Sequence, residues 1–142
     1  MRKLQVQFTK SATRRAEWPL PHDPEVAIVG RSNAGKSSFI NACAGRDVAK
    51  VSQRPGKTRL LNFFSVNQSS SLVDLPGYGY AARSHSEQEQ WKKMIEEYLL
   101  ERKTLCSLLL VMDIRRDWSS DEQLLLDFVN QRGLEFSIIL SK

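Results

Sequence analysis

One segment of eight residues constrains this chain more than any other. Gly30–Ser37 reads GRSNAGKS, follows the apolar run 26–29 and precedes the helix-like stretch 38–44. A glycine-rich loop that ends in Gly-Lys-Ser, set between a strand and a helix, has the layout of a phosphate-binding P-loop. A chance glycine-rich turn is the alternative, and the flanking strand and helix argue against it. The segment therefore predicts a phosphate ligand.

Each residue type in this loop has a physical reason to be there. Gly30 and Gly35 let the backbone curl until successive N–H groups point at phosphate oxygens, where a Cβ would obstruct them. The helix that begins near Lys36 adds its unpaired amides beneath the same oxygens. Lys36 can reach the β- and γ-phosphates, and the Ser37 hydroxyl is suited to ligate Mg²⁺. Without a bound phosphate, Lys36 adds positive charge to a loop that has no anion to hold. We therefore expect the ligand-free fold to tolerate the loss of Lys36.

Composition indicates a small globular domain without a disulfide framework. The 142 residues are enough for one domain with a hydrophobic core. Cys43 and Cys106 lie in apolar segments without metal-ligand spacing, so we expect two buried free thiols. The chain has no apolar leader and no bilayer-spanning apolar run, which predicts a cytoplasmic protein without membrane contact. The net charge of +5 permits a polyanionic partner.

The rest of the chain alternates strands with helices. The expected strands cover 25–30, 61–66, 71–75, 106–112 and 136–140, and the expected helices cover 36–45, 87–103 and 119–132. The charged segment 46–60 has neither the side-chain period of a strand nor that of a helix, which predicts a loop. Residues 1–24 hold three prolines, so we interpret them as an irregular extension before a domain over 25–142. This alternation predicts an α/β fold with a mostly parallel sheet flanked by helices, and a ligand at the carboxyl ends of its strands.

A second motif, Asp74-Leu75-Pro76-Gly77, follows a predicted strand. A carboxylate at a strand end can hold Mg²⁺ through water, and the N–H of Gly77 can face a γ-phosphate. A bare DxxG string is a common turn, so its place after a P-loop carries this prediction. Thr58, in the expected loop, can close on Mg²⁺ when a γ-phosphate is present. A threonine in a loop is otherwise usually solvated.

Four segments of the chain read GRSNAGKSS, PGKTRLLNFF, DLPGYGYA and LLLVMDIRR. Together they resemble the EngB (YihA/YsxC) family, in the TrmE-Era-EngA-EngB-septin-like class of P-loop GTPases, over nearly all of the chain from Phe8 onward. The resemblance implies a Ras-like P-loop GTPase fold, GTP or GDP as ligand and Mg²⁺ as cofactor. It also implies a role in assembling the large ribosomal subunit and in normal cell division and septation.

The resemblance also implies a set of site residues. The residues implied to contact the nucleotide are Gly30, Arg31, Ser32, Asn33, Ala34, Gly35, Lys36, Ser37, Ser38, Gly56, Lys57, Thr58, Arg59, Leu60, Asp74, Leu75, Pro76, Gly77 and Lys142. Within this set, 56–60 would form switch I and 74–77 would begin switch II. Ser37, Thr58 and Asp74 would bind Mg²⁺, while Lys36, Thr58, Gly77 and Asn33 would serve hydrolysis. Asn33 stands where related GTPases hold a potassium ion, although it also suits a left-handed turn.

The carboxyl end of the chain contains only part of the motif that would recognise the nucleotide base. Ser141-Lys142 resembles the first half of the family's Asn/Thr-Lys-x-Asp motif, whose Asp reads the guanine edge. The chain stops before that Asp and before the family's final helix, so we expect a truncated chain, incomplete at its carboxyl end. A phosphate-binding module without hydrolysis and an ATP-using P-loop enzyme are the alternatives. A kinase would need an acceptor site and an arginine-rich lid, and GYGYA after DxxG offers neither.

Two further features bear on hydrolysis and on partners. Tyr78 stands where Ras-like enzymes place the glutamine that orients the attacking water, so we expect slow GTP hydrolysis. Basic residues flank the loop and helices: Arg14, Arg15, Lys50, Arg54, Lys57, Arg59, Lys92, Lys93, Arg115 and Arg116. They predict a surface for the large ribosomal subunit or its RNA, although most such residues are simply solvated. We expect a monomer.

Overall fold

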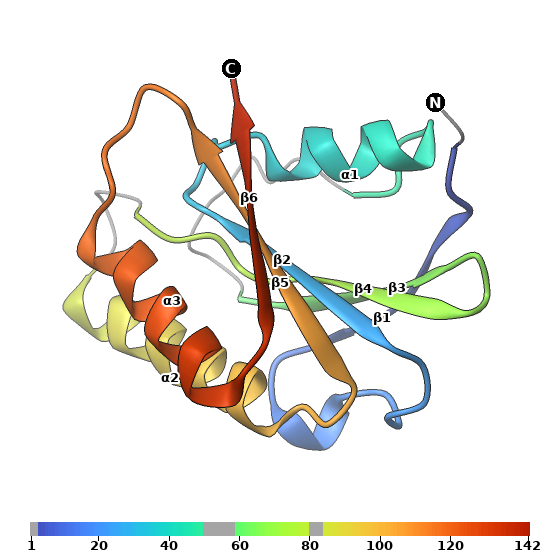
Figure 1. Ribbon diagram of the computed structural model, residues 1–142. Coiled ribbons are helices and arrows are strands. Elements are labelled where there is room, and N and C mark those ends of the chain that lie inside the picture. The colour runs from blue at the N-terminus through green and yellow to red at the C-terminus, as the bar shows by residue number, and fades with distance from the viewer. Residues whose placement is uncertain (1–2, 50–58, 80–83) are drawn as a thin grey trace.

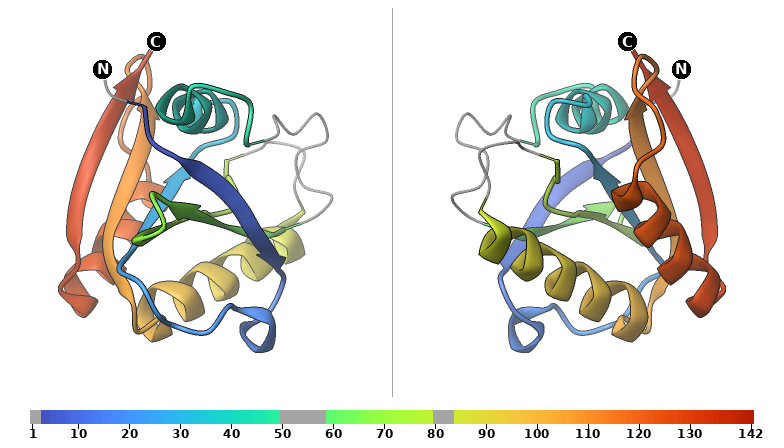
Figure 2. Two further views of the ribbon diagram at one scale, coloured as in Figure 1. Left: turned by 90° about the vertical axis from the view of Figure 1, so that its right-hand side faces the viewer. Right: turned by 90° about the vertical axis from the view of Figure 1, so that its left-hand side faces the viewer.

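The computed structural model describes residues 3–49, 59–79 and 84–142. In chain order its elements are β1 (Val6–Ala12), the 3₁₀ turn η1 (Arg15–Glu17), β2 (Glu25–Gly30), α1 (Lys36–Ala44), β3 (Leu61–Val66), β4 (Ser70–Asp74), α2 (His85–Glu101), β5 (Leu105–Asp113), α3 (Ser120–Arg132) and β6 (Glu135–Ser141). Helix α1 covers one face of a central sheet, and α2 and α3 lie together on the other (Figure 1). The side views of Figure 2 show the same three layers. The predicted α/β fold is confirmed.

The sheet contains six strands in the order β1-β3-β4-β2-β5-β6. Strand β2 pairs in parallel with β4 on one side and with β5 on the other, and β6 is parallel to β5. Strands β3 and β1 add an antiparallel edge. The sheet is therefore mostly parallel, as predicted. Its strand order reverses at β2, and open α/β sheets bind ligands at the carboxyl ends of strands beside such a point.

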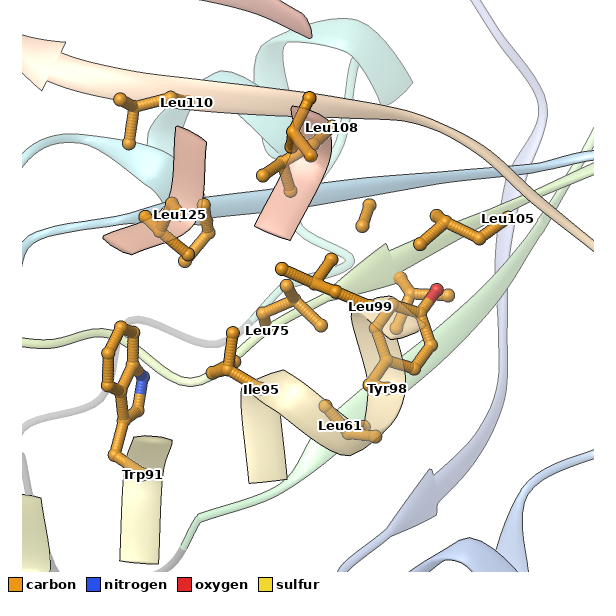
Figure 3. Packing of buried hydrophobic residues seen from close by; sticks show 14 of the residues in the cluster. Leu61, Leu75, Trp91, Ile95, Tyr98, Leu99, Leu105, Leu108, Leu110 and Leu125 are labelled. Carbon is orange, nitrogen blue, oxygen red and sulfur yellow. The ribbon is translucent and has the colours of Figure 1, made fainter. Parts of the chain in front are cut away.

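The alternation of side chains along β2 divides the core into two layers. Ala27 and Val29 pack with the buried side chains of α2 and α3, while Ile28 packs with those of α1. This is the period of two that a strand covered on both faces requires. Figure 3 shows the larger layer, in which Trp91 and Ile95 of α2 meet strand and helix residues that include Leu110 and Leu125.

Local signals set the ends of the helices. Ser84 and Glu87 form a capping box at the start of α2, so this helix begins at His85 rather than at the expected residue 87. Ser119 and Glu122 form the same box at the start of α3. Gly133 ends α3 with a left-handed φ of 73°, as the sequence predicts.

The expectation of an irregular segment over residues 1–24 is wrong for Val6–Ala12. These residues form β1, which runs antiparallel to β3 with Val6 opposite Val66 and Ala12 opposite Leu61. Val6 and Ala12 are buried, whereas the side chains between them are mostly exposed. This strand forms by pairing with residues about fifty to sixty positions further along the chain, and no local sequence pattern predicts it. The division of the chain at residue 24 stays a prediction.

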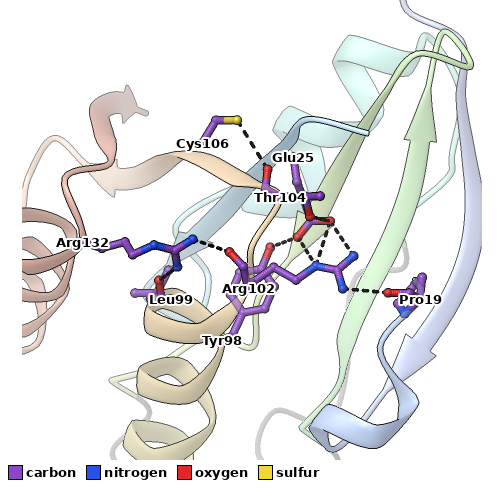
Figure 4. A network of polar contacts seen from close by, with 8 residues as sticks. All are labelled: Pro19, Glu25, Tyr98, Leu99, Arg102, Thr104, Cys106 and Arg132. Carbon is purple, nitrogen blue, oxygen red and sulfur yellow. Dashed lines mark hydrogen bonds and ion pairs between the residues drawn. The ribbon is translucent and has the colours of Figure 1, made fainter. Parts of the chain in front are cut away.

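A buried ion pair ties α2 to the start of β2 (Figure 4). Arg102 Nε and Nη2 donate to the Glu25 carboxylate at 3.0 to 3.2 Å, and Arg102 Nη1 donates to the Pro19 carbonyl at 2.7 Å. Tyr98 donates its hydroxyl to the same carboxylate. Arg132 of α3 donates to the Arg102 carbonyl at 2.6 Å. Donors from several directions therefore satisfy a carboxylate that is removed from water.

Both cysteines are free thiols, as expected, but the expectation that both are buried is wrong. Cys43 is half-buried and Cys106 is exposed. Cys106 follows the buried Leu105, and successive side chains of a strand point to opposite faces of the sheet. Within the ranges that the structure describes, no helix combines the length and the apolar character needed to span a membrane.

Candidate phosphate-binding site

The candidate site lies where the parallel strands β2, β4, β5 and β6 end. The last residues of these strands are Gly30, Asp74, Asp113 and Ser141. Parallel neighbours present their carboxyl ends at one edge of a sheet, so residues far apart in sequence meet here.

The two glycines of the Gly30–Ser37 loop serve different purposes, and only Gly35 has the left-handed backbone that favours glycine. At Gly30 a Cβ would lie 2.8 Å from the carbonyl oxygen of Val111, so β5 leaves no room for a side chain. Gly35 has a φ of 101° and precedes the first residue of α1, Lys36. Asn33 also has a left-handed φ, of 69°. An anion held in this loop would therefore meet the amino end of α1.

Lys36 and Asp74 form an ion pair across the site, from Lys36 Nζ to Asp74 Oδ1. Both side chains are largely buried, with exposed fractions of 15% and 9%. Removing Lys36 would leave the carboxylate of Asp74 buried without this partner, which costs free energy. The ion pair therefore argues against the expectation that the fold tolerates loss of Lys36.

The Asp74–Gly77 turn packs directly against the P-loop. A Cβ at Gly77 would lie 3.2 Å from the Gly30 carbonyl oxygen and 3.4 Å from Ser32 Oγ. The Ser32 amide donates to the Tyr78 carbonyl at 2.8 Å, and Leu75 N donates to the Ile28 carbonyl at 2.9 Å. The two motifs that the sequence marks separately thus form one surface.

The carboxyl end of the described chain closes over the same loop. Lys142 Nζ donates to the Asn33 carbonyl at 2.6 Å, and Ser141 Oγ donates to the Ala34 carbonyl at 2.5 Å. A hollow of about 160 Å³ lies between the P-loop, the segment after β5 and Lys142. The sequence prediction includes Lys142 but omits Ser141 from the site residues. The hydroxyl of Ser141 supports the loop through its hydrogen bond to the Ala34 carbonyl.

Asp113 and Arg115 form a second ion pair at the rim of this hollow. Arg115 donates from Nε to Asp113 Oδ1 at 2.9 Å and from Nη2 to Oδ2 at 2.7 Å. These hydrogen bonds lower the pKa of Asp113 well below its ordinary range. Arg115 was expected on an RNA-facing surface, and here its guanidinium is already engaged by a carboxylate.

Arg31 belongs to the P-loop by its backbone, but its side chain leaves the loop. Arg31 Nη2 donates to Ser119 Oγ at 3.1 Å, and Nη1 donates to the Gly79 carbonyl at 3.4 Å. The guanidinium also lies over the ring of Tyr78, 5.5 Å from its centre. Tyr78 donates its hydroxyl to Glu122, a buried residue that the sequence indicates only as a helix cap. The burial of Glu122 is what marks it as part of the site, and the sequence pattern does not reveal that burial.

The predicted switch I is placed only in part. Gly56, Lys57 and Thr58 lie outside the described residues. The Arg59 side chain is 8% exposed and donates to Glu87 of α2 at 3.2 Å. The expectation that Arg59 contributes to an open basic surface is therefore wrong.

Two of the predicted Mg²⁺ ligands lie on neighbouring elements. Ser37 is in the first turn of α1 and Asp74 ends β4, and Lys36 bridges the two elements. Within the described part of the chain, no group of three or more His, Cys, Asp or Glu gathers as an all-protein cage. Mg²⁺ beside phosphates usually takes one or two protein oxygens and completes its shell with water and phosphate. A hydroxyl and a carboxylate fit that requirement.

Comparison with known proteins places this geometry among GTPases. Residues 25–142 match the family model described as "50S ribosome-binding GTPase". A probable GTP-binding protein EngB from Bdellovibrio bacteriovorus is 56% identical over 137 residues, which cover 96% of this chain and 68% of the relative. The crystal structure of a probable GTP-binding protein EngB superposes with a TM-score of 0.65 at 23% identity, over 83% of this chain and 70% of that one. At that identity the superposition speaks for the fold alone.

A second solved structure is a complex with a nucleotide and RNA. The crystal structure of Era in complex with MgGDPNP and nucleotides 1506–1542 of 16S ribosomal RNA has a TM-score of 0.52 and 26% identity. The match covers 85% of this chain and 41% of Era. The predicted Ras-like P-loop fold is thereby confirmed.

Proposed function

This chain belongs to the EngB family of GTPases, and we propose that it binds GTP and GDP at the P-loop edge of its sheet. The observation that carries this proposal is the meeting of Gly30–Ser37, Asp74–Gly77 and Lys142 at one surface. Phosphates would lie in the P-loop against the amino end of α1. The base would lie toward the hollow beside Lys142 and Asp113.

The ion pair between Lys36 and Asp74 indicates how the site would receive its ligand. Lys36 would exchange the Asp74 carboxylate for the β- and γ-phosphates, which carry more negative charge. Asp74 and the Ser37 hydroxyl would then be available to hold Mg²⁺, with Thr58 as a third proposed ligand. Bound Mg²⁺ would neutralise charge on the phosphate oxygens during transfer.

We propose that this GTPase hydrolyses GTP slowly by itself. The side chain that follows DxxG is Tyr78, which is buried and donates to Glu122, so it offers no carboxamide to an attacking water. Turnover on the order of 10⁻⁴ to 10⁻² per second corresponds to a barrier of about 20 to 23 kcal/mol. A partner that accelerates this step by ~10⁵ would supply about 7 kcal/mol.

The partner we propose is the large ribosomal subunit or its RNA. The description of the matching family supports this, and Era, a structural relative, has been crystallised with ribosomal RNA. Exposed Arg14 and Lys93 line a hollow between the 3₁₀ turn and α2, where they could face a polyanion. A role in cell division and septation, and a cytoplasmic location, are proposed on the family resemblance.

Titration of the purified chain with GTP, GDP and ATP, each with Mg²⁺, tests the nucleotide proposal. We expect GTP and GDP to bind with saturable isotherms and ATP to bind no more tightly than they do, because Ser141-Lys142 supplies only the first half of the base-reading motif. Preference for ATP would favour the ATP-using alternative, and equal affinity for all three would reduce the chain to a phosphate-binding module. A hydrolysis assay with phosphate release as readout separates a slow GTPase from a module that only binds.

A further inference from the structure

Glu122 is a buried carboxylate whose two oxygens face different parts of the molecule. Its Oε1 accepts from the amide and the hydroxyl of Ser119, each at 2.6 Å, and so caps α3. Its Oε2 accepts from the Tyr78 hydroxyl at 2.5 Å and lies 3.9 Å from Arg31 Nη2. One oxygen therefore serves the helix, and the other faces the two motifs of the nucleotide site.

Capping does not explain why this carboxylate is buried. Glu87 occupies the equivalent position in the capping box of α2, and its side chain is 36% exposed. Glu122 is 2% exposed. Burying a carboxylate costs free energy unless donors compensate it. Each glutamate has an arginine near its Oε2, Arg59 for Glu87 and Arg31 for Glu122, so the hydrogen bond from the buried Tyr78 is what distinguishes Glu122 from Glu87.

The contacts continue from Glu122 into the P-loop. Burial and the hydrogen bond to Glu122 raise the pKa of Tyr78, so its hydroxyl remains a donor at neutral pH. The Tyr78 carbonyl accepts from Ser32 of the P-loop at 2.8 Å. Trp91 packs its ring 5.1 Å from that of Tyr78 and donates Nε1 to the Pro76 carbonyl at 2.7 Å. Two side chains outside the two sequence motifs thus hold the Asp74–Gly77 turn: Trp91 bonds to the turn itself, and Glu122 bonds to the adjoining Tyr78.

We propose that Glu122 is a positioning residue of the nucleotide site, which acts through Tyr78 and Arg31 to hold the Asp74–Gly77 turn against the P-loop. This inference rests on the proposed binding of GTP. The turn adjoins the place of the γ-phosphate, which GDP lacks, whereas the P-loop itself serves both nucleotides. Loosening the turn should therefore weaken binding of GTP more than binding of GDP.

The test compares two buried tyrosines that each donate to a buried glutamate. Tyr78→Phe removes the hydroxyl that reaches Glu122 and leaves the Ser119 cap intact. Tyr98→Phe removes the hydroxyl that reaches Glu25 (Figure 4), the first residue of β2, whereas the P-loop follows the last residue of that strand. Calorimetry on the full chain measures the affinity for GDP and for a non-hydrolysable GTP analogue. Because both ligands sample the same folded population, their affinity ratio is insensitive to a loss of stability.

We expect Tyr78→Phe to weaken the GTP analogue relative to GDP by about three- to tenfold, which is the net effect of losing one ordinary intramolecular hydrogen bond. Glu122→Gln keeps the shape and a capping oxygen, and should shift the ratio in the same direction. Tyr98→Phe should keep the ratio of the original chain. An unchanged ratio in both site variants would overturn the positioning role. Failure of the unmodified chain to bind either nucleotide would instead overturn the proposed function, and this inference with it.

Discussion

Lys36 and Asp74 are joined by an ion pair that links the first residue of α1 to the last residue of β4. Lys36, which we propose binds phosphate, and Asp74, which we propose binds Mg²⁺, therefore neutralise each other in this structure. Nucleotide and metal must enter together for both charges to find new partners. We therefore expect nucleotide affinity to depend strongly on Mg²⁺.

Lys36→Ala should abolish measurable GTP and GDP binding and should also destabilise the chain. Its loss leaves Asp74, which is 7% exposed, without this cation, at a cost of about 1 to 3 kcal/mol. Calorimetry measures the affinity, and urea unfolding measures the stability. Adding Asp74→Asn to the variant should restore stability without restoring affinity. Retained GTP affinity in both Lys36→Ala and Ser37→Ala would contradict the P-loop assignment.

Arg102→Ala should cause a larger loss of stability, about 3 to 5 kcal/mol, because it leaves the Glu25 carboxylate buried without its main partner. The side chains of this pair are 5% and 1% exposed. Arg115→Ala is the comparison variant, since Arg115 makes a bidentate pair with Asp113 in which the arginine side chain is 70% exposed. Urea midpoints should fall much further for Arg102→Ala than for Arg115→Ala. Equal midpoints would show that burial of the first pair contributes nothing.

Glu122 should make stability depend on acid pH. Burial by itself raises its pKa, but hydrogen bonds from Ser119 and Tyr78 outweigh it and hold the pKa below the ordinary 4.5. A folded-state pKa below the unfolded value gives stability that is present above about pH 4.5 and is lost as pH falls through the folded pKa. Urea midpoints should therefore drop more between pH 6 and pH 3 for the original chain than for Glu122→Gln. Parallel curves would rule out a lowered pKa at this residue.

Asn33 tests the dependence on a monovalent cation. If its side chain helps to hold potassium near the phosphates, GTP hydrolysis should be faster in KCl than in NaCl at equal ionic strength. Asn33→Ala should remove that difference. Equal rates in the two salts would leave Asn33 as the left-handed turn residue that its φ of 69° describes.

Ribosome binding should depend on both nucleotide and salt. With ~4 phosphate contacts, affinity should fall by about 10³ for each tenfold rise in salt. Pelleting with large ribosomal subunits should recover more protein with a GTP analogue than with GDP. The double variant Arg14→Ala/Lys93→Ala should reduce recovery and leave nucleotide affinity unchanged. Recovery that responds to neither nucleotide nor salt would refute the RNA-facing surface.

Arg59 shows why the basic surface could not be read from charge alone. The sequence places this arginine beside the expected loop, among other cations. In the structure it turns inward and binds Glu87 of α2. Direction and burial of a side chain depend on elements that pack beside it, and charge patterning contains no information about them.

The sequence by itself determined the features that depend on near neighbours: the left-handed turn at Gly35 before α1, the end of α3 at Gly133, and the strand that leads to Asp74. Their physical causes, which are backbone freedom, capping and the period of side chains, act within a few residues. Only the tertiary structure decided that Val6–Ala12 forms a strand, that Lys36 pairs with Asp74, and that Glu122 supports the site through Tyr78. Each of these joins residues about forty or more positions apart, so packing and not local preference brings the partners together.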